Sequence, residues 1–421
     1  MIGRRGRRPG AEYLCPFCFS RIDLVDAHYA CGNPLCAKRF LEHCGKEKAK
    51  RYRSLYHEGE EIDVENSVFL GRDPAGRDAV TTKSHIIRRS EDGLCDVCRR
   101  AAFIRLCPVC HNPIPHSAEE GSDTIFTVLG PRGAGKSHYV AVLIDQLRNP
   151  FSAEFGSTLT PASDRTTVKY RNEYYKRLFE EGRTLPSATP YDDERAARDP
   201  LIYYLRLDRG KPPRSCTLAF FDTAGEDLDS VGRVDALNIG SFVAAASGII
   251  YLVDPLQIPY VNARINVEDK PDASPDVGDR LGYIADILRS RKGLRPGDRI
   301  DVPLAVVLTK ADVLMKEPED DEEEEVLLGP ESSVRVMRRR GTYDERNFDE
   351  VGAEVEEYLR RTVSEGFIQA VDRFSKHEYF AVSALGSSPS GEAIPRGIAP
   401  FRVEDPLIWL LNTCGGGEES E

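Results

Sequence analysis

The sequence predicts an α/β fold with a mainly parallel sheet and helices on both faces, preceded by a small cysteine-rich domain. Three observations support this prediction. Strand-like apolar runs alternate with helical stretches between residues 122 and 385. A glycine-rich turn connects the first of these strands to the first of these helices. Nine of the eleven cysteines precede residue 111.

Composition narrows the class of protein. A chain of 421 residues with 40% hydrophobic content can form two or three domains with real cores. The net charge of −12 argues against a protein built for nucleic acid, although the slightly basic residues 1–120 leave nucleic-acid contact open. The basic start MIGRRGRRPG has no apolar segment after it, and the longest uncharged run, Leu237–Val253, contains glycine and serine. We therefore expect a soluble cytoplasmic protein without a membrane span.

Three zones are expected along the chain. Residues 1–118 form the cysteine-rich domain, and residues 122–390 form the α/β domain with insertions at about 150–200 and 315–345. The second insertion contains the acidic run EPEDDEEEE, which cannot be buried and predicts a solvated loop. Residues 391–421 are expected to form a C-terminal helix near Val403–Asn412 and a disordered tail.

Apolar runs and helical periodicity define the elements of the α/β domain in order. The predicted strands are Thr124–Leu129, Leu201–Leu207, Cys216–Phe221, Gly248–Val253, Val302–Leu308 and the EYFAV run at 378–382. The predicted helices are Lys136–Arg148, Val168–Glu181, Gly278–Arg291 and Phe348–Phe374. The second and third strands are expected to form a hairpin.

The turn after the first strand matches a phosphate-binding loop. GPRGAGKS at 130–137 fits the pattern G-x-x-x-x-G-K-[ST], with a strand before it and a helix after it. Its glycines let successive amides point at phosphate oxygens, and the helix adds its positive end. Lys136 is predicted to reach the β- and γ-phosphates, and the Ser137 hydroxyl to bind Mg²⁺. The backbone contacts are predicted at Gly130, Gly133, Ala134 and Gly135.

Two later segments indicate which nucleotide is bound. DTAGE follows the strand at 216–221, where Asp222 is predicted to hold Mg²⁺ through water and Gly225 to contact the γ-phosphate. TKAD at 309–312 follows another strand, and Asp312 can accept two N–H bonds from guanine that adenine cannot offer. The Lys310 stem is predicted to lie along the base. Thr309, the first residue of TKAD, also belongs to the predicted site. The segment SAL completes it, with Ser383-Ala384 beside the guanine oxygen.

GPRGAGKS, DTAGE, TKAD and SAL, in this order, resemble the nucleotide motifs of the translation-factor and Ras-like GTPases over about residues 122–390. The cysteine-rich front and the long insertions look most like the bacterial double-GTPase family. That family pairs a zinc ribbon with such a domain. The resemblance implies a P-loop GTPase that uses Mg²⁺ to hydrolyse GTP to GDP and phosphate. It also implies protein partners, such as another component of a GTPase system.

Two positions depart from the Ras-like pattern. Arg132 replaces a glycine of the loop, and it can approach the γ-phosphate or simply face solvent. Glu226 stands where glutamine often orients the attacking water, which predicts slow hydrolysis. The threonine that would cap Mg²⁺ is placed at Thr189, with Thr160, Thr166 and Thr167 as alternatives. Lys136, Glu226, Arg132 and Thr189 are thus the candidate catalytic residues.

The paired cysteines predict metal binding rather than disulfides in a chain of this kind. Two structural zinc ions are expected, because thiolates in short knuckles favour tetrahedral zinc. The predicted ligands are Cys15, Cys18, Cys31 and Cys36 for one site, and Cys95, Cys98, Cys107 and Cys110 for the other. A crossed arrangement that joins 15/18 to 107/110, and an iron–sulfur cluster, remain alternatives. Four thiolates fill the coordination shell of zinc and leave no open position for chemistry, so a docking role is expected for this domain rather than a catalytic one.

Three functions are compatible with these motifs. The first is a Mg²⁺-dependent GTPase acting as a switch, with the zinc-bearing front as a docking surface. The second is a catalytically weak GTP-binding scaffold, or a zinc-ribbon module for protein or nucleic acid, which the changes at Arg132 and Glu226 keep open. The third is an ATP-driven machine, which TKAD opposes.

Overall fold

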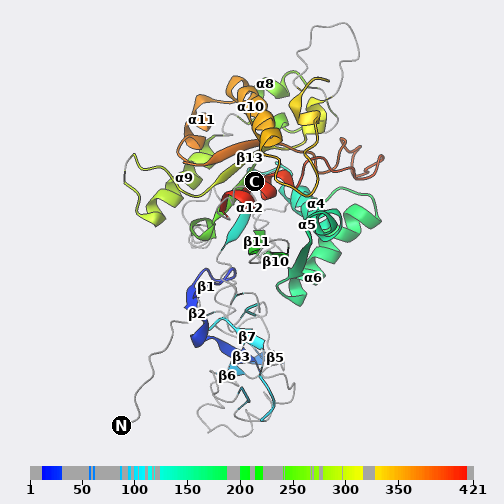
Figure 1. The fold of residues 1–421 in the computed structure, drawn as a ribbon. Helices are drawn as coiled ribbons and strands as arrows, with labels where there is room; N and C mark the ends of the chain where they lie inside the picture. Colours follow the sequence, from blue (N-terminus) through cyan, green and yellow to red (C-terminus); the bar gives the residue numbers. More distant parts are fainter. Residues whose placement is uncertain are drawn as a thin grey trace. The chain divides into compact units, whose positions relative to one another are not determined.

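The computed structural model divides the chain into two compact units, residues 1–123 and 124–421 (Figure 1). Within the described residues, most helices and strands lie in the second unit. The structure describes residues 12–30, 56–57, 60–61, 86–87, 93–95, 99–102, 104–109, 112–115, 118, 124–186, 200–208, 214–220, 240, 242–265, 267, 270–274, 278–295, 297–315 and 328–414.

A seven-stranded sheet forms the centre of the second unit, in the order β14-β13-β12-β8-β11-β10-β9. The strands β8, β12 and β13 are buried at every position, as expected for parallel strands covered on both faces. The strands are β8 (Ile125–Leu129), β9 (Ser157–Pro161), β10 (Leu201–Leu207), β11 (Arg214–Phe220), β12 (Gly248–Val253), β13 (Leu304–Leu308) and β14 (His377–Ala381).

Strand directions place the candidate site at the carboxyl ends of the parallel strands. The strands β14, β13, β12, β8 and β11 are parallel to one another, and β10 is antiparallel to both of its neighbours. After β8 the chain builds β9, β10 and β11 on one side, and then returns to place β12 on the other. Ligands of open α/β sheets bind at the carboxyl ends of the strands beside such a reversal.

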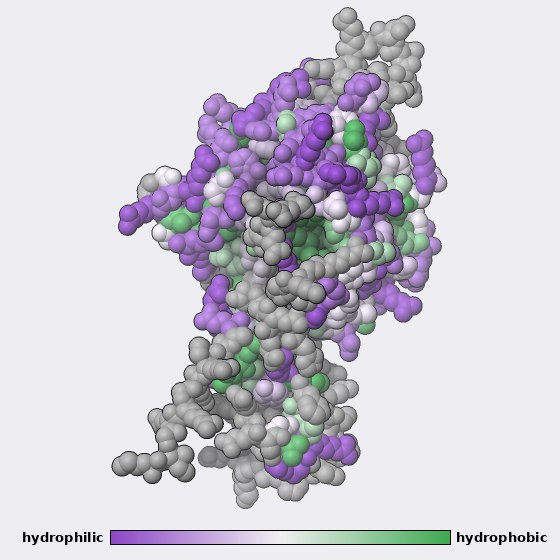
Figure 2. All heavy atoms as spheres, in the orientation of Figure 1, coloured by the Kyte–Doolittle hydropathy of each residue, from purple (hydrophilic) through white to green (hydrophobic). Residues whose placement is uncertain are grey.

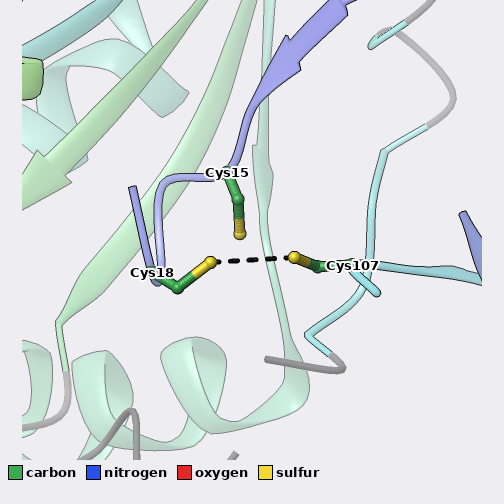
Figure 3. A group of neighbouring side chains, drawn as sticks. All are labelled: Cys15, Cys18 and Cys107. Atoms are coloured by element: carbon green, nitrogen blue, oxygen red, sulfur yellow. Dashed lines mark hydrogen bonds between the residues drawn. The ribbon is translucent and has the colours of Figure 1, made fainter. Parts of the chain in front are cut away.

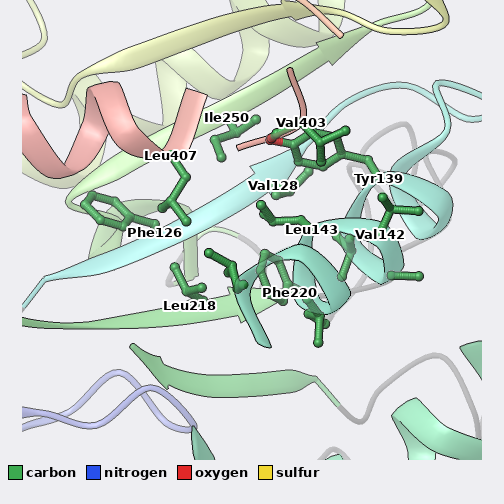
Figure 4. Close-up of a cluster of buried hydrophobic side chains, with 14 of the residues drawn as sticks. Phe126, Val128, Tyr139, Val142, Leu143, Leu218, Phe220, Ile250, Val403 and Leu407 are labelled. Carbon is green, nitrogen blue, oxygen red and sulfur yellow. The ribbon is translucent and has the colours of Figure 1, made fainter. Parts of the chain in front are cut away.

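Helices cover both faces of the sheet, and alternation along β12 shows how. Ile250 and Leu252 belong to the core cluster that includes α4 and α12 (Figure 4). Tyr251 points to the opposite face, where its ring contacts Phe367 of α11. The α-helices of this unit are α4 (Lys136–Arg148), α5 (Pro150–Phe155), α6 (Asp164–Lys169), α8 (Pro259–Asn262), α9 (Asp279–Lys292), α10 (Glu345–Thr362), α11 (Glu365–Val371) and α12 (Asp405–Cys414).

Most predicted elements are present, with instructive differences. The helix α4 and the strand β12 have the predicted bounds. The helix predicted at Phe348–Phe374 is instead two helices, because Val363 and Ser364 are extended between α10 and α11. The helix predicted from Val168 begins at Asp164 and continues as a π-helix over Tyr170–Glu180. The edge strand β9 was not predicted, since its pattern STLTP becomes a strand only by pairing with β10.

The C-terminal helix α12 is part of the core of the second unit. Leu407 and Leu410 are fully buried, and Trp409 contacts the ring of Phe380 on β14. The visible face of the protein is mainly hydrophilic in Figure 2, in keeping with this inward arrangement of apolar residues. Within the described residues, no helix combines the length and the apolar character that a bilayer crossing requires.

Glu378 of β14 lies beneath α10, where a glycine lets the helix approach. A Cβ added at Gly352 would overlap Glu378 Oε1. Burial raises the pKa of Glu378 to about 7, against the hydrogen bond from the Tyr379 amide that lowers it. Asp349 and Glu356 on α10 raise the pKa further through charge repulsion. The carboxyl is therefore most compatible with the fold when it is protonated.

Glu378→Gln is expected to stabilise the protein by about 1–2 kcal/mol at pH 8 and to have almost no effect at pH 4. The folded pKa lies above the ordinary 4.5, so the stability from this group is present below pH 4.5. That stability is lost as the pH rises through 7, and glutamine has no proton to lose. Urea unfolding at both pH values measures the difference, with the exposed Glu357→Gln as control. An equal effect at both pH values would contradict the prediction.

The first unit contains short strands. A hairpin forms from β1 (Glu12–Leu14) and β2 (Arg21–Asp23). The strand β3 (His28–Ala30) pairs with β6 (Ile86–Ile87) and with β7 (Ile104–Leu106), and β4 (Tyr56–His57) pairs with β5 (Glu60–Glu61). Among the described residues of this unit, the paired strands are only two or three residues long, which is typical of small domains that depend on bound metal.

Candidate nucleotide-binding site

The glycine-rich loop between β8 and α4 has a conformation that glycine favours. Gly133 and Gly135 have φ values of 78° and 83°, in the left-handed region. A Cβ at Gly130 would stand 2.8 Å from the carbonyl oxygen of Leu252, so the loop needs glycine to pack against β12. Gly135 directly precedes α4, a 13-residue helix. The loop therefore ends at a helix N-terminus, which favours anions.

Side chains from two places hold this loop. Lys136 Nζ donates to the carbonyl oxygens of Gly130 and Pro131, at 2.8 and 2.9 Å. Gln257, in the turn after β12, donates from Nε2 to the carbonyl oxygen of Arg132 at 2.6 Å. The ammonium group of Lys136 thus lies at the loop itself, where it adds positive charge to the helix N-terminus.

Thr309 connects the loop to the sheet. Its side chain is almost fully buried, and its Oγ1 lies 3.1 Å from the carbonyl oxygens of both Ala134 and Val253. Ala134 belongs to the phosphate loop and Val253 ends β12. Thr309 therefore connects the TKAD segment, which contains Asp312, to the phosphate loop and to the end of β12.

Lys310 is held by a carboxylate that the sequence analysis missed. Lys310 has φ of 52°, and its Nζ lies 2.6 Å from Oδ2 of Asp254, whose side chain is fully buried. The other carboxylate oxygen of Asp254 accepts the amide of Leu256 at 2.9 Å. A signal for Asp254 exists in the sequence, because it ends the apolar run GIIYLV in the way that Asp222 ends its own strand.

Asp312 is oriented by the segment after β14. Ser383 Oγ donates to Asp312 Oδ1 at 2.6 Å and accepts the amide of Gly386 at 2.9 Å. Ser383 is 2% exposed, so this contact is shielded from water. The two segments predicted to contact guanine, TKAD and SAL, are therefore in direct contact.

The phosphate loop and Asp312 line one cavity of about 370 Å³. This volume lies within the range of small-molecule pockets. The predicted site residues that line it are Arg132, Gly133, Gly135, Lys136, Ser137, Thr309, Lys310, Asp312, Ser383 and Ala384. A single ligand can therefore contact both the helix N-terminus and the carboxylate, which is the geometric requirement for a nucleotide. The roles of the individual residues remain predictions.

Other predicted residues take different places. Arg132 is exposed, although it also lines the cavity. Thr160 lies on β9, and Thr166 and Thr167 lie on α6. The remaining predicted residues of the nucleotide site, Asp222, Gly225, Glu226 and Thr189, lie outside the described residues.

One wall of the cavity comes from the segment that precedes Thr189. Thr184, Leu185 and Pro186 line it. The amide of Leu185 donates to Nε2 of His138 at 3.0 Å, so the residue after Ser137 fixes this wall. No sequence pattern predicted that contact, because it joins positions 47 residues apart.

Three predicted zinc ligands meet in the first unit. The sulfur atoms of Cys15, Cys18 and Cys107 all lie within 4.8 Å of one another (Figure 3). The Cys18 and Cys107 sulfurs are 3.7 Å apart. Cys107 thus joins the Cys15 pair, as in the crossed arrangement. The other predicted ligands, Cys31, Cys36, Cys98 and Cys110, lie outside the described residues.

The cysteine loops share one backbone turn. The Cys15 amide donates to the carbonyl oxygen of Ser20, five residues later, at 3.1 Å. The Cys95 amide bonds to Arg100 at 2.8 Å and the Cys107 amide to Asn112 at 2.9 Å, again five residues later. This repeated turn suits a pair of thiolates that point to the same ion, as at Cys15 and Cys18.

The fold and the cavity together define a P-loop GTPase domain, and comparison with known proteins identifies the family. Residues 124–395 match the family described as Double-GTPase 2, and the chain belongs to that family. A relative from Mycolicibacterium smegmatis, SaeC, is described as an ESX-1 scaffolding and assembly protein. It is 29% identical over 326 residues, which cover 75% of this chain and 81% of the relative.

Two solved structures show more distant likeness. One is the signal recognition particle receptor SRb-GTP/SRX complex from Chaetomium thermophilum, with a TM-score of 0.29, 13% identity, and coverage of 64% of this chain and 94% of that one. The other is the Arl6 BBS3 small GTPase from Trypanosoma brucei with bound GppNp, with a TM-score of 0.27, 11% identity, and coverage of 70% and 99%. The family match alone carries the assignment.

Proposed function

We propose that this protein binds GTP with Mg²⁺ in the cavity, hydrolyses it slowly to GDP and phosphate, and acts as a nucleotide-controlled switch. The observation that carries the proposal is the cavity itself, which is lined by the phosphate loop at one place and by Asp312 and Ser383 at another. A nucleotide with its phosphates at the loop can reach Asp312 with its base. Guanine presents the two N–H donors that this carboxylate needs.

Each end of the cavity has a defined task. The amides of Gly130, Gly133, Ala134 and Gly135 and the Lys136 ammonium would hold the phosphates. Ser137, in the first turn of α4, fits a metal ligand because it lines the cavity beside Lys136. Ser137 and Asp222 would hold Mg²⁺, which would neutralise charge on the β- and γ-phosphates. The Gly225 amide would donate a hydrogen bond to the γ-phosphate, a contact that exists only before hydrolysis.

Hydrolysis would depend on groups around the γ-phosphate. Glu226 would hold the attacking water, and Thr189 would complete the site around Mg²⁺. Arg132 would approach the γ-phosphate from the exposed side of the loop. A carboxylate near phosphate charge is a poor substitute for an amide, so slow turnover is proposed.

The decisive experiment compares GTP with ATP on the full-length, zinc-loaded protein. GTP is expected to bind about 100-fold or more tightly than ATP, and phosphate release from GTP is expected to need Mg²⁺. Lys136→Ala serves as the control that removes phosphate binding. Equal binding of ATP and GTP, or no binding of either, would overturn the proposal.

A scaffold function is the second candidate, and the description of SaeC as a scaffolding and assembly protein favours it. In that case GTP would bind without release of phosphate and would only stabilise the fold. Protein partners follow from either function. Residues 1–118 would supply the docking surface, and salt-sensitive binding of nucleic acid to them remains a weaker proposal.

We propose that zinc stabilises the first unit. Cys15, Cys18 and Cys107, together with Cys110, would hold one structural ion. The remaining predicted cysteines, which include Cys95, would hold a second ion. Both sites would lack an open position for chemistry, so the ions would act by stabilising a unit with little core.

Zinc content distinguishes crossed from sequential pairing. The wild-type protein is expected to contain two zinc ions, and the double variant Cys15→Ser/Cys107→Ser only one, because both thiolates serve the same ion. Sequential pairing would instead remove both ions. Cys216→Ser is the control, since this thiol is buried in β11 and is expected to leave the zinc content unchanged. Metal analysis of the purified full-length variants measures the outcome.

A further inference from the structure

The loop that follows Ser383 is a well-defined part of the cavity wall. Gly386 has φ of 80° at its start, and the Ala399 amide donates to the carbonyl oxygen of Leu385 at 2.9 Å, which closes the loop at its base. At its tip, Ser390 and Ala393 exchange two backbone hydrogen bonds of 3.0 Å. Residues 386–394 are here called the 386–394 loop.

The 386–394 loop is attached to the segment 182–184, which leads into the wall formed by Thr184, Leu185 and Pro186. The Thr184 amide donates to the carbonyl oxygen of Glu392 at 2.8 Å, and the Ile394 amide donates to Gly182 at 2.9 Å. The Glu392 carboxylate also forms an ion pair with Arg183. Two backbone bonds and the ion pairs of Glu392 with Arg177 and Arg183 therefore hold the loop in place.

Two serines of this loop have hydroxyl groups that form no hydrogen bond within the described part of the chain. Ser387 and Ser388 both line the cavity. Their Oγ atoms are buried, and neither has a hydrogen-bond partner among the residues that the structure describes. A buried hydroxyl without a partner is unfavourable, and few persist in native proteins without a reason. A ligand in the cavity would supply the missing partners.

We propose that Ser387 and Ser388 are further guanine-binding residues that donate hydrogen bonds to the acceptor edge of the base; this inference rests on the proposed function. Asp312 can accept only from the N–H groups of guanine, which leaves N7 and the O6 carbonyl, with its two lone pairs, to accept hydrogen bonds from other groups. Ser383, on the same segment, contacts Asp312 at 2.6 Å. Because the two hydroxyls follow Ser383 by only four and five residues and line the same cavity, we assign them to the base rather than to the phosphates.

The double variant Ser387→Ala/Ser388→Ala tests the proposal in titrations with GDP and inosine diphosphate. Guanine and the hypoxanthine base of inosine diphosphate both carry the O6 carbonyl and N7, and only guanine carries the exocyclic amine. The variant is expected to bind both nucleotides about 10-fold more weakly, with their ratio unchanged. The exposed Ser290→Ala on α9 is the matched control and is expected to bind as the wild type does.

Three outcomes would overturn the inference. Unchanged affinity would show that the hydroxyls do not contact the ligand. A loss confined to GDP would place their effect on the amine edge, through Asp312. A lower unfolding temperature of the nucleotide-free variant would indicate a structural role, because alanine removes no bond from the described structure. If the wild-type protein itself fails to bind GDP, the proposed function fails instead.

Discussion

Asp312→Asn is expected to weaken GDP binding by about 10²- to 10⁴-fold and to create tight binding of xanthosine diphosphate. The carboxylate would accept two N–H bonds from guanine, and charged hydrogen bonds of this kind contribute about 1.5–3 kcal/mol each. Asparagine accepts one bond and donates the other. It therefore matches xanthine, which has a carbonyl in place of the exocyclic amine.

The geometry of the site supports this exchange. Ser383 Oγ donates to Asp312 Oδ1, and the asparagine oxygen can accept the same bond, so the side chain is expected to keep its orientation. Titration with both diphosphates measures the exchange. The control is Asp301→Asn, an exposed aspartate that pairs with Lys292 near the start of β13. Weakened GDP binding without any gain for xanthosine diphosphate would contradict base recognition by Asp312.

Arg402→Met is expected to destabilise the protein by about 3–5 kcal/mol, because it leaves buried polar groups without partners. Arg402 is 2% exposed and has φ of 53°. It donates to the Val336 carbonyl oxygen at 2.7 Å and to Asn347 Oδ1 at 2.5 Å. Its Nε lies 2.7 Å from Asp405 Oδ2, as an ion pair without hydrogen-bond alignment.

This network joins elements that are distant in the sequence. Arg338 donates to the other oxygen of Asp405 at 3.0 Å and to Glu154 on α5. Burial raises the pKa of Asp405 even though both arginines lower it. The Asp405 carboxylate is therefore stable in the core only while the guanidinium groups of Arg338 and Arg402 lie beside it. The position of α12, which begins at Asp405, depends on these two arginines.

Urea unfolding measures the effect of Arg402→Met. Arg402→Lys is expected to fall between the wild type and Met, since lysine restores the charge but not the forked geometry. The control Arg346→Ala removes an exposed ion pair with Glu350 and is expected to cost less than about 0.5 kcal/mol. A loss below about 1 kcal/mol for Arg402→Met would show that the network adds little.

Local patterns predicted most of the described helices and strands of the second unit. The phosphate loop could be predicted because its glycines encode backbone angles that few other residues adopt, as at Gly133 and Gly135. The bounds of β12 and α4 followed from a continuous apolar run and a glycine before a helical pattern. The long helix prediction was wrong at Val363 and Ser364, because it passed over the helix-start signal that Ser364 and Glu365 give at the N-terminus of α11.

The sequence by itself determined the class of fold, the phosphate loop and the residue types available to choose a base. Only the tertiary structure decided which of them meet. It placed Asp254 against Lys310, His138 against Leu185, and Cys107 beside Cys15 and Cys18. It also brought the hydroxyls of Ser387 and Ser388, which have no partner among the described residues, into the cavity. The physical reason is range: glycine angles and apolar periodicity act between neighbours along the chain, whereas ion pairs, thiolate clusters and cavity walls depend on strand order and packing between distant segments.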